Sequence, residues 1–341
     1  MVSPLNIVWH MHNTIGLPAQ VSMMMMDMCS AEFHNCVAKI RHPDYRQNIF
    51  LDRINNCSLR CAAELSNITK RQAKNIIMNP RQILFSLMAA IAISTVASAQ
   101  TGPTVPPGPL PVWADEFDYT GLPDSSKWSY DVGGHGWGND EWQYYTKGRK
   151  ENVWVENGKL VIEARKENFE GRNFTSTRLV SKGKGDWQYG RIEVRAKLPK
   201  GRGTWPAIWM LASTDTLKWP DDGEIDIMEH VGYNQGIIHG TVHTKKYYHS
   251  IGTQKSDTIP VPDASEKFHV YALDWNADSI RISVDNKTYF TFHNEHTGND
   301  AWPFDKKFHL LLNIAVGGSW GGQKGVDDSI FPARFEIDYV R

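Results

Sequence analysis

Three carboxylates occur within six residues of one apolar segment, Glu224-Ile225-Asp226-Ile227-Met228-Glu229. Acidic side chains are costly among apolar neighbours unless they are paired or perform a function. Glycosidic bonds are commonly cut by two carboxyl groups, and like charges this close together raise one another's pKa. One of these groups is therefore expected to hold a proton near neutral pH. The segment predicts a glycosidase site, although a solvated acidic edge strand would show the same spacing.

The same segment alternates as a β-strand does, with successive side chains on opposite faces. Glu224 and Asp226 would then share one face, and Glu229 would fall on the other. One extra residue, a β-bulge near Ile227-Met228, would return Glu229 to the acidic face. We predict this bulge, because the chemistry requires both glutamates to reach the same sugar.

Two tryptophans precede the acidic segment on a further predicted strand, 205–211. Trp205 and Trp209 would share a face, roughly 13 Å apart at the usual rise per residue. Indole faces at that spacing suit two sugar rings of one chain. The alternative places both indoles in the core, but Ile208 and Met210 already supply the opposite, buried face.

A third strand is expected downstream of the acids, where His239, Thr241 and His243 would share a face. If this strand pairs with the acidic one, His243 could form a hydrogen bond with Asp226 or Glu229. A histidine on a strand can equally be a polar residue with no part in the chemistry, and the sequence leaves both interpretations open.

Composition narrows the class of partner. The 341 residues carry a net charge of −1, which gives no electrostatic basis for binding nucleic acid or an anionic membrane. The chain contains 13 Trp, a side chain whose broad apolar face and single donor suit sugar rings. A polysaccharide partner is therefore favoured.

Residues 78–99 have the pattern of a secretory signal peptide. Arg81 supplies the positive start, the apolar run 83–93 is too short to span a membrane, and Ala97 and Ala99 form a small-residue cleavage site. The mature protein is thus expected to begin near Gln100, to be secreted, and to have no membrane segment.

The other boundaries follow from the signal peptide. Residues 1–77 have no sustained hydrophobic period and are interpreted as a non-native or mis-assigned extension, expected to be disordered. Residues 100–111 form a linker rich in Pro and Gly. Residues 112–341 would form the catalytic domain.

From residue 112 onward, short alternating segments separated by turn signals indicate an all-β fold. Asn157-Gly158 between two such segments is a strong hairpin signal, and a second hairpin is expected to turn through Asn286-Lys287. The continuous apolar run 308–316 predicts a central strand. Many short strands without a long helix predict a sandwich of two sheets.

These residues resemble glycoside hydrolase family 16, and within it the laminarinase-type endo-β-1,3-glucanases, over residues 113–341. The resemblance rests on motifs in the family's order and spacing: Asp115-Glu116-Phe117, residues 137–145, 176–179, 203–210 and 224–229, and Asn313-Ile314-Ala315-Val316-Gly317-Gly318. It implies a concanavalin-like β-jelly-roll sandwich of two curved antiparallel sheets, with an open cleft on the concave face.

The resemblance also implies roles. The chain would be a retaining endo-glycosidase that hydrolyses internal β-1,3-glucosidic bonds of laminarin-type β-glucans through a covalent glycosyl-enzyme. Glu224 would be the nucleophile and Glu229 the acid/base, and Asp226 would lie between them and tune the nucleophile. The expected substrate contacts are Asn139, Arg178, Trp205, Trp209 and His243.

No cofactor is expected for catalysis. Family members often hold a structural Ca²⁺, and Glu116, Gly158 and Asp338 match that site; calcium prefers oxygen ligands, including backbone carbonyls. The expected partner is a β-glucan, bound by a monomer.

Two alternatives stay open at this point. The same fold and chemistry could act on mixed-linkage glucan, agar or porphyran. The sandwich could also be a non-catalytic carbohydrate-binding lectin, because a fold does not fix a function. A binding site would gain nothing from three crowded acids, which favours hydrolysis.

Overall fold

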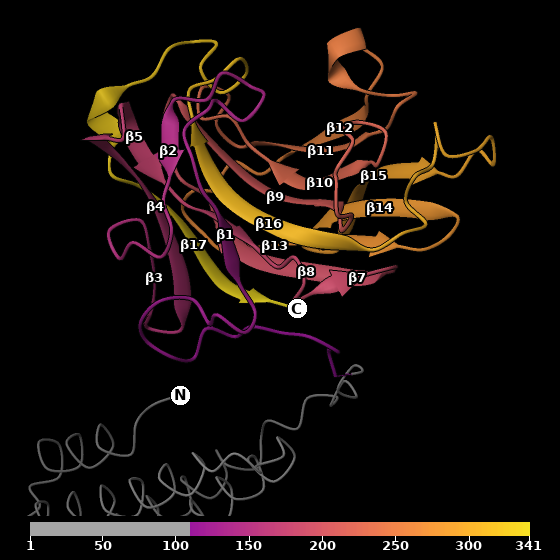
Figure 1. Ribbon diagram of the computed structural model, residues 1–341, viewed down its shortest axis with the longest axis horizontal. Helices are drawn as coiled ribbons and strands as arrows, with labels where there is room; N and C mark the ends of the chain where they lie inside the picture. The colour runs from indigo at the N-terminus through magenta and orange to yellow at the C-terminus, as the bar shows by residue number, and fades with distance from the viewer. Residues whose placement is uncertain (1–109) are drawn as a thin grey trace, which may run out of the picture. The chain divides into compact units, whose positions relative to one another are not determined.

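Two curved β-sheets packed face to face make up residues 110–341, the part of the chain that the computed structural model describes (Figure 1). The predicted extension 1–77, the signal peptide 78–99 and most of the linker 100–111 lie outside the described residues. Residues 110–341 belong to one compact unit. The predicted all-β sandwich of two sheets is confirmed.

The first sheet carries the acidic segment as its strand β10, which lies between two longer strands. In Figure 1 this sheet lies over strands of the second, so that one face of β10 points to the interior and the other away from it. In spatial order its strands are β1 (Ser129–Asp131), β6 (Arg178–Val180), β16 (Phe308–Val316), β9 (Thr204–Ala212), β10 (Glu224–Glu229), β11 (Ile237–His243) and β12 (Lys255–Pro260), with β7 (Asp186–Trp187) beside β16.

The second sheet backs the first. Its pairs are antiparallel except for β2 and β5, which run parallel, a detail that the expectation of purely antiparallel sheets did not include. In spatial order its strands are β15 (Lys287–His293), β14 (Ser279–Val284), β13 (His269–Trp275), β8 (Gly190–Lys197), β17 (Ala333–Val340), β4 (Lys159–Phe169), β5 (Arg172–Ser176) and β2 (Gln143–Tyr145), with β3 (Val153–Glu156) beside β4.

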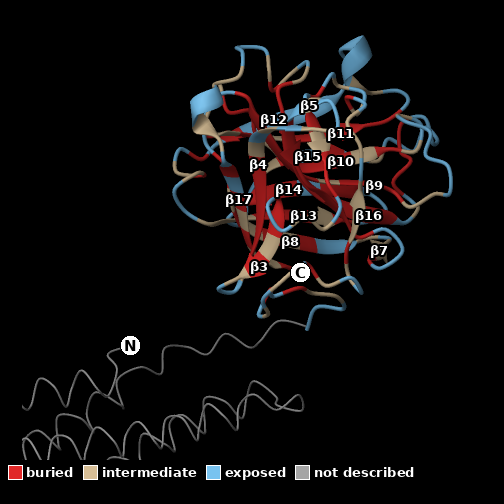
Figure 2. Ribbon diagram, turned by 60° about the vertical axis from the view of Figure 1, so that its left-hand side comes forward, coloured by how far each residue is buried: buried red, intermediate tan, exposed pale blue. Residues whose placement is uncertain are grey.

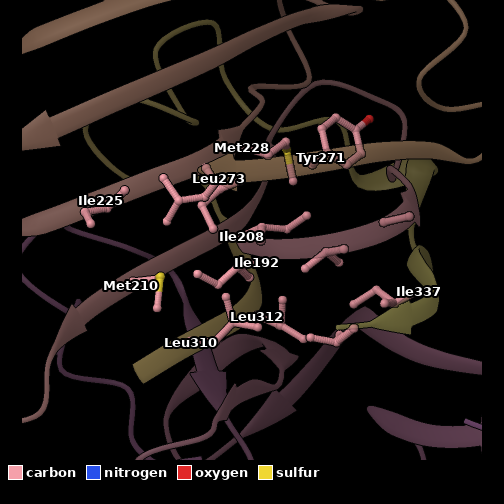
Figure 3. Packing of buried hydrophobic residues seen from close by; sticks show 14 of the residues in the cluster. Ile192, Ile208, Met210, Ile225, Met228, Tyr271, Leu273, Leu310, Leu312 and Ile337 are labelled. Carbon is pink, nitrogen blue, oxygen red and sulfur yellow. The ribbon is translucent and has the colours of Figure 1, made fainter. Parts of the chain in front are cut away.

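The core fills the space between the sheets. Ile208, Met210 and Ile225 point from the first sheet toward Tyr271 and Leu273 of the second, as Figure 3 shows. All nine residues of β16 are buried, as expected for the apolar run at 308–316. Burial of this area is the main favourable term in folding and holds the first sheet as a rigid platform.

The β3–β4 hairpin forms where Asn157-Gly158 predicts it. Both turn residues have positive φ, 52° and 71°, as a two-residue type I′ turn requires. The second hairpin, β14–β15, turns through Asp285-Asn286 and not through Asn286-Lys287, so that detail of the prediction was wrong. The physical reason is that Asp and Asn tolerate positive φ, whereas Lys287 starts the next strand.

Helices contribute little to the described residues. Two 3₁₀ helices occur there, η1 (His249–Ile251) and η2 (Asp328–Ile330), and both lie at exposed ends of the sandwich (Figure 2). No helix within residues 110–341 is long and apolar enough to cross a membrane.

The predicted bulge in β10 is confirmed. The register shifts between Asp226 and Met228 where β10 pairs with β9, and between Asp226 and Glu229 where it pairs with β11. Ile227 and Met228, although consecutive, are therefore both fully buried in the core. Glu229 returns to the face that carries Glu224 and Asp226.

Candidate active site

An open cleft of about 680 Å³ lies over the outward face of the first sheet. Its volume is in the range of a site for an extended ligand. Among its lining residues are all eight catalytic and substrate-contact candidates from the sequence: Asn139, Arg178, Trp205, Trp209, Glu224, Asp226, Glu229 and His243. The structure thus brings these residues together, while their individual roles stay predictions.

Glu224 begins β10, directly after a turn that only glycine suits. Gly223 has a φ of +87°, and a Cβ there would lie 2.8 Å from Pro303. The Trp219 indole donates a hydrogen bond of 2.9 Å to Glu224 Oε2. Burial raises the pKa of Glu224 to about 7, opposed by the Trp219 hydrogen bond and by the charge of Arg178.

Asp226 is the most deeply buried of the three acids, with 2% of its side chain exposed. Burial, followed by the charges of Glu224 and Glu229, raises its pKa well above the ordinary value. Asp226 therefore holds a proton and donates it in a hydrogen bond to Glu224, which favours the ionised form of Glu224.

His243 faces Glu224 across the β10–β11 pair, as expected if these strands are neighbours. Its Nε2 lies 3.5 Å from Asp226 Oδ2 and 3.8 Å from Glu224 Oε1. Burial, with a smaller effect from His249, lowers the pKa of His243 to about 3, so the imidazole is neutral at working pH. His243 thus places no positive charge beside the acids.

Glu229 occupies a different electrostatic environment at the other end of β10. The Trp205 indole donates a hydrogen bond of 2.9 Å to its Oε1. Burial, together with the charges of Glu224 and Glu141, raises the pKa of Glu229 to about 8, and the Trp205 hydrogen bond opposes the shift. Unlike Glu224, it has neither the Arg178 charge nor a hydrogen bond from Asp226 in its favour. Glu224 is therefore the group that ionises first, and Glu229 keeps its proton to higher pH.

Arg178 lies between two indoles on the floor of the cleft. Its guanidinium carbon is 4.7 Å from the ring centre of Trp137 and 4.6 Å from that of Trp209. Its Nε lies 3.0 Å from Asp131 Oδ2. Cation–π contacts on both sides hold the three side chains in one stack, which fixes the orientation of the Trp209 ring.

A chain of hydrogen bonds holds Trp209 from the other side. Its indole donates to Asn313 Oδ1 at 2.7 Å, and Asn313 Nδ2 donates to the Tyr145 hydroxyl at 3.0 Å. Tyr145 in turn donates to Glu141 Oε2 at 3.2 Å, and Gln143 donates to the same oxygen at 2.6 Å. The network satisfies buried polar groups and rigidifies the cleft floor.

Comparison with known proteins identifies the family. A profile of the family described as Glycosyl hydrolases family 16 matches residues 140–341. The Beta-glucanase of Rhodothermus marinus is 60% identical over 238 residues, 67% of this chain and 83% of that protein. The chain belongs to family 16. The resemblance found in the sequence is thereby confirmed.

Solved structures of family 16 agree with this fold. The laminarinase from Rhodothermus marinus is 59% identical and superposes with a TM-score of 0.67, covering 67% of this chain and 95% of that one. SCLam, a non-specific endo-β-1,3(4)-glucanase of family 16 crystallised with 1,3-β-D-cellotriosyl-glucose, is 51% identical, with a TM-score of 0.67 and coverage of 69% and 95%. The concanavalin-like jelly roll expected from the sequence is the fold of this chain.

Several functional candidates of this family 16 site were not identified from the sequence. Trp219 lies five residues before Glu224 in a Pro-containing turn, and its spacing does not show that the loop folds back onto the carboxylate. Asn313 and Glu141 belong to motifs that carried the family resemblance. Their spacing in the sequence does not predict their hydrogen bonds with Trp209 and Tyr145. Trp320 packs against Trp205 and His239 at the Glu229 end, and only the tertiary structure reveals it.

We expect Asn313→Ala to lower kcat/KM on laminarin about 10-fold, mainly through a higher KM, because the Trp209 indole loses its acceptor and the platform loosens. Initial rates over a range of laminarin concentrations measure the effect. Asn313→Asp is the matched control, since it keeps an acceptor oxygen for Trp209, and we expect it to retain more of the affinity. Equal KM values for Asn313→Ala and the native protein would contradict this role.

The three residues predicted to bind calcium lie near one end of the second sheet, brought there by the β17–β4 pairing and the bridge of the N-terminal segment to β17. Two carboxylates and the carbonyl of Gly158 are donors of the type that calcium prefers. Both carboxylates already accept from guanidinium groups, Glu116 from Arg341 at 2.8 Å and Asp338 from Arg195 at 2.5 Å. The charge is thus balanced by arginine, and calcium at this position stays a prediction.

Proposed function

We propose that this chain is a retaining endo-glycosidase that hydrolyses internal β-1,3-glucosidic bonds of laminarin-type β-glucans. The observation that carries the proposal is the bulged strand β10, which presents Glu224 and Glu229 to one cleft in unlike electrostatic environments. The names of the relatives, a β-glucanase and a laminarinase, support the choice of substrate. The open cleft supports endo action, because a long chain can lie across it.

In the first step, Glu229 donates its proton to the glycosidic oxygen while the Glu224 carboxylate attacks the anomeric carbon. The C–O bond to the leaving sugar breaks, and a covalent glycosyl-enzyme forms on Glu224. In the second step, Glu229 removes a proton from water, which attacks the same carbon and releases Glu224. Two displacements at one carbon retain its β-configuration.

Asp226 tunes this cycle without touching the anomeric carbon. Its proton, shared with Glu224, stabilises the negative charge before attack, when the nucleophile must be ionised. When Glu224 becomes an ester, that charge disappears and the hydrogen bond weakens. The neutral His243 beside Asp226 limits the number of charges buried at the site.

A mixed-linkage glucan is the second candidate substrate, because the similar enzyme SCLam is described as non-specific for β-1,3(4)-glucans. Purified residues 100–341 should be assayed on laminarin, lichenan, agarose and carrageenan, with product sizes analysed. We expect reducing ends and mixed oligosaccharides from laminarin at the highest kcat/KM. Binding to laminarin without release of reducing ends would indicate a lectin and refute the proposed function.

We also propose that the mature protein is secreted. The signal pattern of residues 78–99 supports this, with its positive start, short apolar run and Ala97-x-Ala99 site. N-terminal sequencing of the exported protein should begin at Gln100. A first residue within 1–77 would overturn both the proposed export signal and the interpretation of that extension.

We propose a structural Ca²⁺ at Glu116, Gly158 and Asp338, on the family resemblance and the oxygen donors. The temperature midpoint of unfolding should then be higher in about 1 mM calcium than in a chelator, since a ligand that binds the native state stabilises that state. Asp338→Asn is the matched variant and should lose the difference. An identical midpoint with and without calcium in the native protein would remove the proposal.

A further inference from the structure

Three potential metal donors from two neighbouring strands converge at the Glu224 end of the cleft. His243 Nε2 lies 3.8 Å from Glu224 Oε1 and 3.5 Å from Asp226 Oδ2, and donors of the three residues all lie within 4.8 Å of one another. In a tetrahedral zinc site with bonds of 2.0–2.2 Å, neighbouring ligand atoms lie about 3.3–3.6 Å apart. Shifts of a few tenths of an ångström to about 1 Å would place the three donors around one ion.

A second observation also points to a ligand at this position. Asp226 Oδ2 has no hydrogen-bond partner among the described residues, although only 2% of the side chain is exposed and the atom faces His243. Buried polar atoms of native proteins are nearly always satisfied. Glu224 Oε1 also faces the group, because the Trp219 indole occupies the other oxygen of that carboxylate.

We propose that Glu224, Asp226 and His243 form an inhibitory site for a transition-metal ion of the Zn²⁺ class. One imidazole nitrogen and two carboxylate oxygens suit zinc, whereas calcium and magnesium prefer oxygen alone. Binding of the ion would release the proton of Asp226 to solvent. The fourth position would face the open cleft and hold water. The ion would occupy the carboxylate of Glu224, the group that attacks the sugar, so inhibition would be reversible and competitive with the glucan.

The surroundings set the affinity. Metal-bound histidine usually donates its other ring N–H to a carboxylate, carbonyl or water, and loss of that contact costs about 10–100-fold in affinity. His243 Nδ1 has no such partner among the described residues. The neighbouring ring is that of His249, which lies edge-on with its centre 5.3 Å from the centre of the His243 ring. We therefore expect a dissociation constant in the micromolar range, weaker than that of a structural zinc site.

The test is calorimetric titration of zinc chloride into the native protein in a non-chelating buffer. We expect one ion per chain, and His243→Gln should weaken it at least about 10-fold. His239→Gln is the matched control: its side chain lies on the same face of β11 and in the same cleft, but opposite Glu229. The control should keep zinc affinity within about twofold. Equal weakening in both variants would overturn the proposal.

Two further readouts do not depend on how the variants fold. Cobalt(II) added to the native protein should give the intense visible absorption of a tetrahedral site, and zinc should abolish that absorption. Zinc should also raise the KM for laminarin and leave kcat unchanged. No cobalt spectrum, or inhibition that lowers kcat alone, would refute the metal site. Hydrolysis of laminarin by the metal-free protein would persist in either case, so the proposed function would be unaffected.

Discussion

Replacing Glu224 by Gln should lower kcat on laminarin by at least about 10⁴-fold, a barrier increase of about 5–6 kcal/mol. The amide keeps the shape of the side chain and an oxygen that can accept from Trp219. It cannot form a glycosyl ester, so no covalent intermediate accumulates. Glucan affinity should change only a few-fold, because the aromatic floor around Arg178 is untouched.

Reducing-end assays and calorimetry with laminarin oligosaccharides separate the two effects. Glu266→Gln, an exposed glutamate outside the cleft, is the control and should keep native activity. Glu224→Ala in azide gives a sharper result: a small anion can enter the space and displace the leaving group in one step, which yields the α-glycosyl azide. A β-azide from this variant would show that Glu224 is not the nucleophile.

The features that the sequence could predict are those set by local chemistry. Asn157-Gly158 has few alternatives to a type I′ turn, and a mostly apolar run such as 308–316 favours burial on both faces. The bulge was predictable because Glu224 and Glu229 must reach the same sugar, whereas strict alternation would place Glu229 among the isoleucines. In each case the side chains of one short segment decide its backbone.

The features of the site that the sequence could not predict depend on contacts between segments that are distant in sequence. The Trp219 indole reaches Glu224 because a loop folds back over the cleft, and Asn313 meets Tyr145 across 168 residues. No periodicity within a segment encodes such pairs. The unlike environments of Glu224 and Glu229 likewise come in part from Arg178, which is contributed by a distant strand. Spacing could therefore identify the acids, but only the fold distinguishes their roles.

Replacing Glu229 by Gln should lower kcat on laminarin about 10²–10⁴-fold, the usual contribution of general acid–base catalysis. The decrease in kcat should be smaller on an aryl β-glucoside oligomer, because its leaving group departs without needing a proton. With that substrate the second step becomes limiting, because no base activates water. Azide should then accelerate turnover and yield a β-glycosyl azide, since it attacks the intermediate already formed on Glu224.

The pH profile tests the same assignment. The active form has Glu224 ionised and Glu229 protonated, so activity should fall on the acid side as Glu224 gains its proton and on the alkaline side as Glu229 loses its own. Burial raises the pKa of Glu229 to about 8, which places the alkaline limb far above the range of an ordinary carboxyl group. Because the acids interact, the two limbs report on the group as a whole.

Glu229→Gln should abolish the alkaline limb of kcat/KM on the aryl substrate and keep the acid limb, because kcat/KM reports the first step from the free enzyme. The reason is that the amide has no proton to lose in this range, while Glu224 still titrates. Activity of the variant should be measured from pH 5 to pH 10 beside the native protein. If the alkaline limb persisted unchanged in Glu229→Gln, another group would have to supply the proton, and the division of roles along the bulged strand would be wrong.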